Sequence, residues 1–299
     1  MADDLVSELP TLRLYSGGPS VVLWQKFLVA KGHSSGAPDG MFGNGAKKST
    51  ESYQRSIGVG ADGVVGRGTY EKAIADGFDP SGLGYGAATD PNDPASVRPA
   101  PGFTPTLVDA KDRGAAKLAS KHRRSALRSA QELDKVDGIV LHQMSFYRKG
   151  DTIDRYADVP AHYIITQQGE LAQLHDHNVY LYTSNSLNAT TVGVEFAGNF
   201  ASTSGSFYQK QKFWACVLTP HQVSAARLLL ETVQRDRGIT KVYSHIQAYA
   251  GRSNCGGPDI WASVGQWGVD VLRLSDGGPG WKKDDGAEIP DVWRTWGRA

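Results

Sequence analysis

Two histidines and one cysteine stand at positions where their side chains could converge on a metal ion. His142 ends an apolar run over residues 138–142, and His245 ends another over residues 241–245. Cys255 follows His245 by ten residues, on a glycine-rich loop. Imidazole and thiolate are common Zn²⁺ ligands, and a catalytic zinc site uses three protein ligands and one open position. Such a site could hydrolyse an unactivated amide. A lone histidine is more often structural, so the trio by itself is only a hypothesis.

The two histidines require strands that end at the same edge of a sheet. Apolar runs predict strands over residues 138–142, 191–196 and 241–245. Two more strands are expected within residues 162–174, on either side of a Gln-Gln-Gly turn. Along 191–196 the apolar side chains alternate, so Glu195 points away from the apolar face.

A long helix is expected between the last two strands. Thr219 is a suitable N-cap, Pro220 takes the first helical position, and Gln222 completes a capping box. Gly238 marks the end, because glycine readily adopts the left-handed conformation found after a helix. The alternation of strands and helices from Val136 onward predicts an α/β domain with a mixed central sheet flanked by helices.

The N-terminal segment carries a short internal repeat. Residues 38–43 (PDGMFG) recur as residues 61–66 (ADGVVG), and each copy follows a helical stretch. Each stretch holds an aromatic residue followed by glutamine, first Trp24-Gln25 and then Tyr53-Gln54. The Asp-Gly pairs supply tight turns. The pattern predicts a small all-α domain of about three helices.

This segment resembles the peptidoglycan-binding domain family found on many cell-wall hydrolases. The matching features are Gly18-Pro19, the two aromatic-Gln pairs, the two Asp-Gly turns, and Gly66 with Thr69. The resemblance covers about 65 residues, and its motif occurs twice. It implies that the segment binds bacterial peptidoglycan, with Trp24 and Tyr53 among the substrate-binding residues. A generic small helical domain is the alternative.

The α/β segment resembles the phage-type N-acetylmuramoyl-L-alanine amidase family, which is related to the peptidoglycan recognition proteins. The matching stretches, in the family's order, are Ile139 to His142, Ala161 to Ile165 with Gly169, Val192 to Glu195 with Gly198, and Ser244-His245 through Gly251-Arg252 to Cys255 and Pro258. The resemblance implies that His142, His245 and Cys255 bind Zn²⁺. Relatives use Cys or Asp as the third ligand, and Asp259 is the competing candidate here.

The same resemblance implies roles for three further residues. Glu195 matches an acidic position that serves as general base in part of the family. Many relatives place an oxyanion-stabilising lysine two residues before the third ligand, but this chain has Ser253 there. The neighbouring Arg252 is therefore the candidate, although its fork is larger and aims differently. His162 lies in a matching strand without being a ligand, and we interpret it as a structural or substrate-lining residue.

Other titratable residues have less specific interpretations. His175 and His177 lie close together, but we interpret them as resembling a metal-binding pair only superficially. Cys216 is interpreted as a buried free thiol, because two cysteines form no disulfide framework in a chain of 299 residues. The basic stretch between Lys111 and Arg128 is either a solvated helical face or a surface attracted to anionic wall polymers or lipid. Gln143 replaces a second His or Asn that several relatives carry after the first ligand.

Composition fits a folded protein that does not bind nucleic acid. Hydrophobic residues make up 40% of the chain and charged residues 21%, and the net charge is only +1. No run of about 18 apolar residues could span a membrane. The first ten residues carry acidic side chains where a secretory signal needs a basic start. We therefore expect a protein made in the cytoplasm that acts on the wall after release or delivery, and we expect a monomer.

The expected organisation is a peptidoglycan-binding domain at 8–78, a Gly/Pro-rich linker at 79–106, a zinc amidase domain at 107–275 and a tail at 276–299. The tail's tryptophans either pack on the amidase domain or contact a partner. The expected reaction is hydrolysis of the amide between N-acetylmuramic acid and L-alanine of the stem peptide, as in a phage endolysin.

Three alternatives to an endolysin remain open. One is a non-catalytic recognition protein on the same scaffold, and another is an amidase toxin delivered by a secretion system. The third is a cytosolic amidase that recycles muropeptides. The presence of all three candidate ligands favours an enzyme, and the wall-binding domain argues against recycling.

Overall fold

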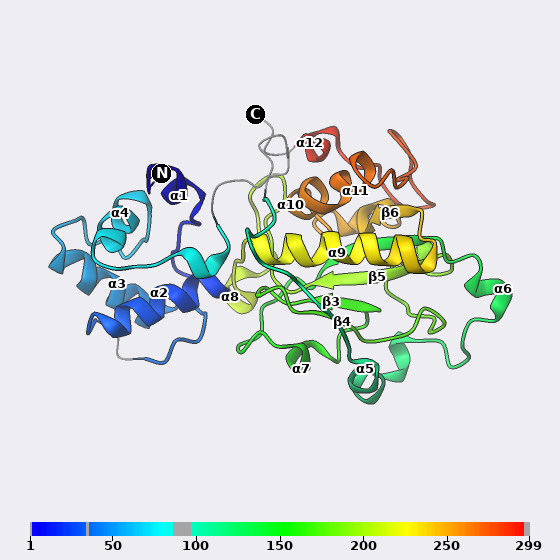
Figure 1. Cartoon of the computed structure of the whole chain (residues 1–299), viewed down its shortest axis with the longest axis horizontal. Helices are drawn as coiled ribbons and strands as arrows, with labels where there is room; N and C mark the ends of the chain where they lie inside the picture. Colours follow the sequence, from blue (N-terminus) through cyan, green and yellow to red (C-terminus); the bar gives the residue numbers. More distant parts are fainter. Residues whose placement is uncertain (1, 34–35, 86–96, 296–299) are drawn as a thin grey trace.

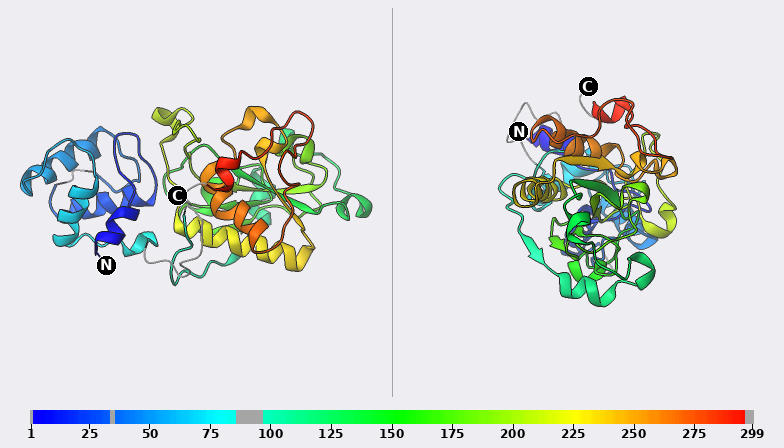
Figure 2. Two further views of the ribbon diagram at one scale, coloured as in Figure 1. Left: turned by 90° about the horizontal axis from the view of Figure 1, so that it is seen from above. Right: turned by 90° about the vertical axis from the view of Figure 1, so that its right-hand side faces the viewer.

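The computed structural model describes residues 2–33, 36–85 and 97–295, and it shows a helical region beside a sheet region (Figure 1). The helices of the N-terminal region are α1 (Ala2–Glu8), α2 (Pro19–Ala30), α3 (Asn44–Ser56) and α4 (Arg67–Ala75), followed by the 3-10 turn η1 (Ser81–Leu83). Seen from above, this region lies at one end of the molecule (Figure 2). The prediction of a small all-α domain in front of an α/β domain is confirmed.

The core of the helical region is built around the ring of Trp24. This ring is fully buried and meets Tyr53, Tyr70 and Phe78 edge-on, with centroid distances of 5.7, 5.9 and 5.6 Å. Its indole Nε1 donates a hydrogen bond to Thr50 Oγ1 at 2.9 Å. Edge-to-face aromatic pairs are favourable and bury a large apolar area, so they stabilise a short segment with few other core residues.

The internal repeat of the sequence is also a repeat of hydrogen bonds. The Gln25 amide donates to Asp39 Oδ1 and accepts from the Asp39 backbone N–H, both at 2.9 Å. The Gln54 amide donates to Asp62 Oδ1 and accepts from the Gly63 N–H, again at 2.9 Å. Each buried amide is thus satisfied by the Asp-Gly turn that follows it. This explains why a glutamine accompanies each aromatic residue.

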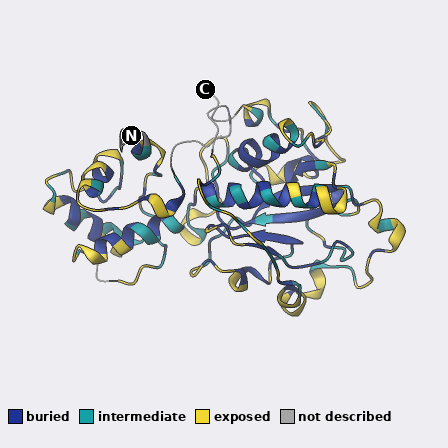
Figure 3. Ribbon diagram, viewed as in Figure 1, coloured by how far each residue is buried: buried dark blue, intermediate teal, exposed yellow. Residues whose placement is uncertain are grey.

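The sheet region contains a mixed sheet with the strand order β1-β4-β3-β5-β2-β6. Its strands are β1 (Leu107–Asp109), β2 (Gly138–Gln143), β3 (Tyr163–Ile165), β4 (Leu171–Gln173), β5 (Thr191–Phe196) and β6 (Lys241–Ser244). β3 and β4 are antiparallel, and the other neighbouring pairs are parallel. The predicted α/β fold class is confirmed, and the central strands are buried (Figure 3).

Helices cover both faces of this sheet. They are α5 (Lys111–Lys117), α6 (Ala130–Leu133), α7 (Ile153–Tyr156), α8 (Lys210–Phe213), α9 (Pro220–Arg237), α10 (Pro258–Ile260), α11 (Gln266–Asp270) and α12 (Asp291–Arg294). Shorter turns are η2 (Ser120–His122), η3 (Asn185–Leu187), η4 (His245–Gln247), η5 (Ala250–Arg252) and the π-helical η6 (Trp261–Gly265). No helix in the described part of the chain has both the length and the apolar character needed to cross a membrane.

Helix α9 begins and ends where the sequence predicts. Thr219 Oγ1 accepts a hydrogen bond from the Gln222 N–H at 3.1 Å, and the Thr219 N–H donates one to Gln222 Oε1 at 3.3 Å. Gly238 ends the helix with φ 66°. The helix buries Val223 and Leu230 against the sheet face that carries Leu141. This core cluster packs on one face of the central strands. The opposite face of the same strands carries the candidate site.

The basic stretch is not one solvated helix. Helix α5 ends at Lys117, and Arg128 is 5% exposed. The Arg128 guanidinium donates to four backbone carbonyls, those of His177, Val179, Asn188 and Thr191. Arg128 therefore fastens the loop before β5 to the sheet, because guanidinium donors satisfy carbonyls that would otherwise be buried without partners.

The segments on either side of residues 86–96 pack on the rest of the chain. Residues 86–96 of the expected linker lie outside the described residues. Before them, Leu83 is buried in the helical core. After them, the Val97 N–H donates to Ser263 Oγ at 3.0 Å, and the Ala100 N–H donates to Ser224 Oγ at 2.9 Å.

The described part of the tail packs on the sheet region. Trp293 is 2% exposed, and its Nε1 donates to Thr203 Oγ1 at 2.6 Å. Trp281 stacks on Tyr243 of β6 with a centroid distance of 4.7 Å. Trp296 lies outside the described residues. Of the two interpretations of the tail, packing on the domain is therefore the one that holds for Trp281 and Trp293.

Candidate functional site

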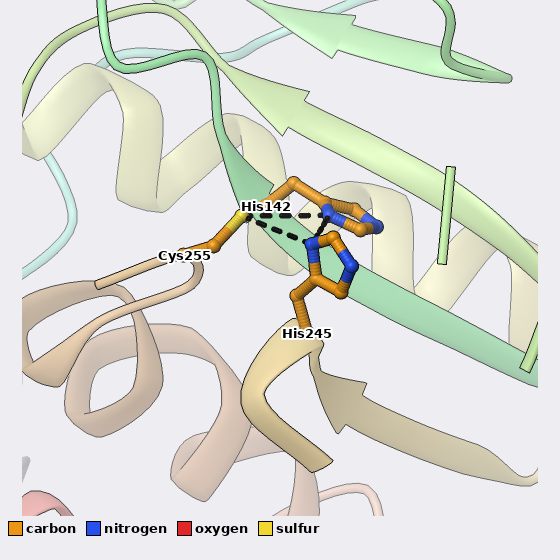
Figure 4. Close-up of side chains that lie close together, drawn as sticks. All are labelled: His142, His245 and Cys255. Atoms are coloured by element: carbon orange, nitrogen blue, oxygen red, sulfur yellow. Dashed lines mark hydrogen bonds between the residues drawn. The ribbon is translucent and has the colours of Figure 1, made fainter. Parts of the chain in front are cut away.

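His142 and His245 meet at the edge where two neighbouring parallel strands end. His142 lies in β2, and His245 directly follows β6. β2 and β6 pair with Leu141 opposite Ser244, so the two histidines come next along the strands and lie side by side. Cys255 reaches them from the loop after η5 (Figure 4).

The three side chains point their donor atoms at one another. The Nδ1 atoms of His142 and His245 are 3.0 Å apart. The Cys255 sulfur lies 3.4 Å from His245 Nδ1 and 3.5 Å from His142 Nδ1. All the donor atoms lie within 4.8 Å of one another, as a shared metal ion requires. Two imidazole nitrogens and one thiolate sulfur fit zinc by their chemistry and leave a further coordination position open.

Burial sets the protonation of these ligands. It lowers the pKa of His142 well below 6.5, and the nearby His245 and Arg252 lower it further. Burial also lowers the pKa of His245 to about 4, with a contribution from Arg252. Both imidazoles are thus neutral at pH 7, which is the form that binds metals. Burial raises the pKa of the Cys255 thiol, and Glu195 adds to the rise. Metal binding would therefore release the thiol proton.

The second nitrogen of each imidazole has a partner in the turn before β5. His245 Nε2 lies 2.7 Å from Asn185 Oδ1, and His142 Nε2 lies 3.0 Å from Ser184 Oγ. Asn188 Oδ1 accepts the N–H groups of Thr183 and Ser184, which holds this turn in place. Such partners orient a ligand histidine and select the tautomer that leaves Nδ1 free.

Sequence reasoning missed Ser184, Asn185 and Asn188. In the sequence they belong to a polar run that is typical of any surface turn. Nothing in the spacing links Asn185 to His245, which lies 60 positions further along.

The Cys255 loop is held under β2 by hydrogen bonds on both sides. The Gln143 amide donates to the Asn254 carbonyl, and Gln143 Oε1 accepts from the Phe200 N–H at 2.7 Å. Ser244 Oγ donates to the Cys255 carbonyl at 2.9 Å. A β-carbon on Gly256 would lie 2.4 Å from the Leu141 carbonyl oxygen, so only glycine allows this close approach. Gln143 thus has a clear function in this chain, which is to position the third ligand.

Glu195 lies beside His142 on the neighbouring strand. The two residues are partners in the parallel pairing of β2 and β5, so their side chains share one face of the sheet. Burial raises the pKa of Glu195 to about 8, and the charge of Arg252 acts against this rise. Within the described residues, Glu195 Oε2 is buried and has no hydrogen-bond partner. A carboxyl group with these properties can hold or release a proton near neutral pH.

Arg252 is exposed on η5, and its charge acts on Glu195 and on both histidines. The guanidinium is therefore electrostatically coupled to the site. Ser253, which occupies the position of the lysine in many relatives, supplies no charge.

Comparisons with known protein families cover both regions. Residues 132–258 match the sequence model of the family described as "N-acetylmuramoyl-L-alanine amidase". This range holds all three residues of the candidate metal site. The chain carries an N-acetylmuramoyl-L-alanine amidase domain. Residues 17–72 match the family described as "Putative peptidoglycan binding domain", which lies N-terminal to the amidase domain. Both predicted resemblances are confirmed.

The amidase domain is also similar to solved structures. LysC, an N-acetylmuramoyl-L-alanine amidase from Clostridium intestinale URNW, is 15% identical over 57% of this chain and 100% of that chain, with a TM-score of 0.38. Drosophila PGRP-LB is 14% identical over 59% and 99%, with a TM-score of 0.38. The Ph2119 endolysin of a Thermus scotoductus MAT2119 bacteriophage is 14% identical over 51% and 92%, with a TM-score of 0.34. No curated protein matches the chain.

Three residues that the sequence proposed for substrate binding are buried. Trp24 and Tyr53 are 0% exposed, and His162 is 1% exposed. Trp24 and Tyr53 form the core of the binding domain, so the prediction that they contact the substrate is wrong. In the amidase domain, His162 Nδ1 accepts from the Gly193 N–H at 3.1 Å, and its Nε2 donates to the Val179 carbonyl at 2.9 Å. Of the two interpretations of His162, the structural one holds.

The other titratable residues stay outside the metal cluster of the amidase domain. Within the described residues, one group of His, Cys, Asp or Glu side chains is close enough together to hold a metal ion, and it consists of His142, His245 and Cys255. Asp259 and His175 are not part of it. His177 is buried with its Nε2 2.7 Å from the Tyr163 hydroxyl. Cys216 is a buried free thiol, and burial raises its pKa to about 12.

Proposed function

We propose that the chain is a zinc-dependent hydrolase that cuts the amide between the lactyl group of N-acetylmuramic acid and L-alanine of the stem peptide. The observation that supports zinc is the convergence of two Nδ1 atoms and one sulfur, with the opposite imidazole nitrogens held by Ser184 and Asn185. Bound zinc would supply a Lewis acid for the carbonyl and would lower the pKa of a bound water.

The chain's own residues would handle the proton and the developing charge. Glu195 would accept a proton from the attacking water and deliver it to the leaving amine. Its pKa, raised to about 8 by burial, suits both steps near neutral pH. Arg252 would stabilise the oxyanion, since its charge already acts on the site.

The N-terminal domain would hold the enzyme on its polymeric substrate and raise its effective concentration there. In this proposal residues 8–78 bind the wall and residues 107–275 catalyse the cleavage. A chain that both binds peptidoglycan and cuts it is suited to opening a cell wall. We therefore propose host-cell lysis, as by an endolysin, as the biological role, with the protein reaching the wall from the cytoplasm by release or delivery.

The test is mass analysis of purified sacculi digested with the chain, with and without a chelator. We expect release of stem peptides that begin with L-alanine, loss of this release after chelation, and its return when Zn²⁺ is added back. New reducing sugar ends would instead mean a glycosidase and would contradict the proposal.

The two cysteines provide a matched pair of variants for the same assay. Cys255→Ala removes a ligand, so it should lose zinc and stem-peptide release together. Cys216→Ala removes the other thiol, which is buried in the hydrophobic core cluster outside the trio, so this variant should keep both zinc and stem-peptide release. Equal zinc content in the two variants would remove Cys255 from the site.

A further inference from the structure

The internal repeat of the binding domain creates two corresponding hollows. The first hollow is lined by Gln25, Asp39, Met41, Gly43, Gly45 and Ala46, among others, and has a volume of about 430 Å³. The second hollow is lined by the repeat equivalents of these residues, Gln54, Asp62, Val64, Gly66, Gly68 and Thr69, and has a volume of about 300 Å³. The two sites therefore share one design and differ in particular side chains.

Among the described residues, the amidase domain contributes lining residues to the first hollow but not to the second. Lys149 and Trp214 line the first hollow, whereas the lining of the second hollow comes from the binding domain alone. One pair of equivalent lining residues also differs between the two hollows. Thr69 lines the second hollow and accepts a hydrogen bond from Gln54 at 3.1 Å, while the equivalent residue that lines the first hollow is the smaller Ala46. The first hollow is therefore larger, and two residues of a second domain line part of it.

Backbone hydrogen bonds between the two domains hold Trp214 in this position. The backbone N–H of Ala215 donates to the Tyr15 carbonyl at 2.6 Å, and the Gly17 N–H donates to the Ala215 carbonyl at 2.8 Å. A β-carbon on Gly17 would lie 2.8 Å from the Trp214 β-carbon, so the glycine is needed for this approach. A β-carbon on Gly43 would lie 4.0 Å from Trp214 Cη2, so the far edge of the ring stands at the start of α3.

The groups around the first hollow suit a saccharide. The Trp214 ring is half-buried and offers an apolar surface to one face of a sugar. Lys149 is exposed and has no ion-pair partner among the described residues. Ser49 is 9% exposed and lines the hollow, and its side-chain hydroxyl makes no hydrogen bond within the described part of the chain. Pockets of this volume that combine an aromatic ring with a few polar groups bind small organic units such as a sugar.

We propose that the first hollow, which Trp214 and Lys149 line on the amidase side, binds an N-acetylated sugar of the peptidoglycan glycan strand. The proposal rests on the proposed function, which makes peptidoglycan the substrate. It adds that the amidase domain completes the wall-binding site, so the strand is held between the two domains. The bound strand then has a fixed orientation relative to the metal site, rather than being tethered nearby by a flexible linker.

The repeat supplies a matched pair of blocking variants. Gly45 and Gly68 are equivalent helix residues, and a β-carbon on either meets nothing within 4 Å. Gly45→Tyr places a ring in the first hollow, and Gly68→Tyr places one in the second. A second pair reverses a charge on the amidase domain, with Lys149→Glu at the hollow and Lys135→Glu at another exposed position. Binding of the full chain to purified sacculi is measured by co-sedimentation on ice during a short incubation.

We expect Gly45→Tyr to weaken binding to sacculi at least tenfold and Lys149→Glu to weaken it severalfold, while Gly68→Tyr and Lys135→Glu bind like the unmodified chain. Glycan strands freed of their stem peptides should compete with sacculi for the unmodified chain. Equal binding by Gly45→Tyr and Gly68→Tyr would overturn the proposal, and so would competition by free stem peptides but not by glycan strands.

The failure of this proposal can be told apart from failure of the proposed function. If the unmodified chain releases stem peptides from sacculi but the two glycine variants bind equally, the proposed amidase function is supported and the proposed sugar site in the first hollow is wrong. If the unmodified chain releases no stem peptides, the proposed function fails, whatever the binding result.

Discussion

Removing the Asn185 side chain should weaken zinc binding without disturbing the fold. Asn185 Oδ1 lies 2.7 Å from His245 Nε2, and His245 is 5% exposed. A buried N–H left without an acceptor costs about 1–3 kcal/mol, and loss of such an outer partner typically weakens metal binding about 10–100-fold. We therefore expect the zinc dissociation constant to rise about 10–100-fold.

The substitution must avoid a second effect at the same position. Asn185 has φ 49°, a left-handed conformation in which alanine would be strained. Asn185→Gly removes the acceptor and tolerates this φ, so it isolates the hydrogen bond. Asn185→Asp keeps an acceptor and should bind zinc at least as tightly as the unmodified chain. The turn itself is held by Asn188, whose Oδ1 accepts the Thr183 and Ser184 N–H groups in both variants.

The assay is competition for Zn²⁺ between metal-free protein and a chromophoric chelator. Substitution by Co²⁺ gives a second readout, because a cobalt–thiolate absorption band reports whether Cys255 still binds. A dissociation constant for Asn185→Gly within twofold of the unmodified chain would refute the reasoning. Equal weakening by Asn185→Asp would refute it too, because that variant retains the acceptor.

Three further predictions concern catalysis, pH and the core. Glu195→Gln should keep its zinc but lower kcat about 10²–10⁴-fold, and a kcat equal to that of the unmodified chain would remove Glu195 from the mechanism. Burial raises the pKa of Asp151 from 3.8 to about 7, so its carboxyl stabilises the fold fully only below pH 4 and loses this contribution as pH rises to 7. Asp151→Asn should remove up to about 4 kcal/mol of that pH dependence in denaturant unfolding between pH 4 and 8, and an unchanged dependence would contradict this. Trp24→Ala should destabilise the binding domain by about 3–5 kcal/mol in the same measurement, and a loss below about 1 kcal/mol would mean that the buried ring is not central to the core.

Local patterns were enough to predict the elements that position the metal ligands. The capping box at Thr219 and the glycine at position 238 correctly predict where α9 begins and ends. The alternation along 191–196 correctly turns Glu195 to the face that it shares with His142. These features depend on residues a few positions apart, so the sequence carries them directly.

The sequence misjudged residues whose role depends on burial. Trp24 and Tyr53 belong to the repeated motif of a binding domain, yet both lie in its core. An aromatic residue beside a polar one fits a binding surface as well as a helix that buries one face. Only the packing of α2 against α3 decides between the two, because exposure is a property of the assembled helices.

The sequence by itself determined the metal-binding residue types, the order of the elements and the repeat of the binding domain. The tertiary structure alone decided what surrounds those residues. Gln143 holds the loop of Cys255 across 111 positions, and Asn185 orients His245 across 60. Trp214 reaches the first hollow only through the contact between domains. Hydrogen bonds and contacts between distant positions form when packed elements bring their ends together, and no local pattern encodes that approach.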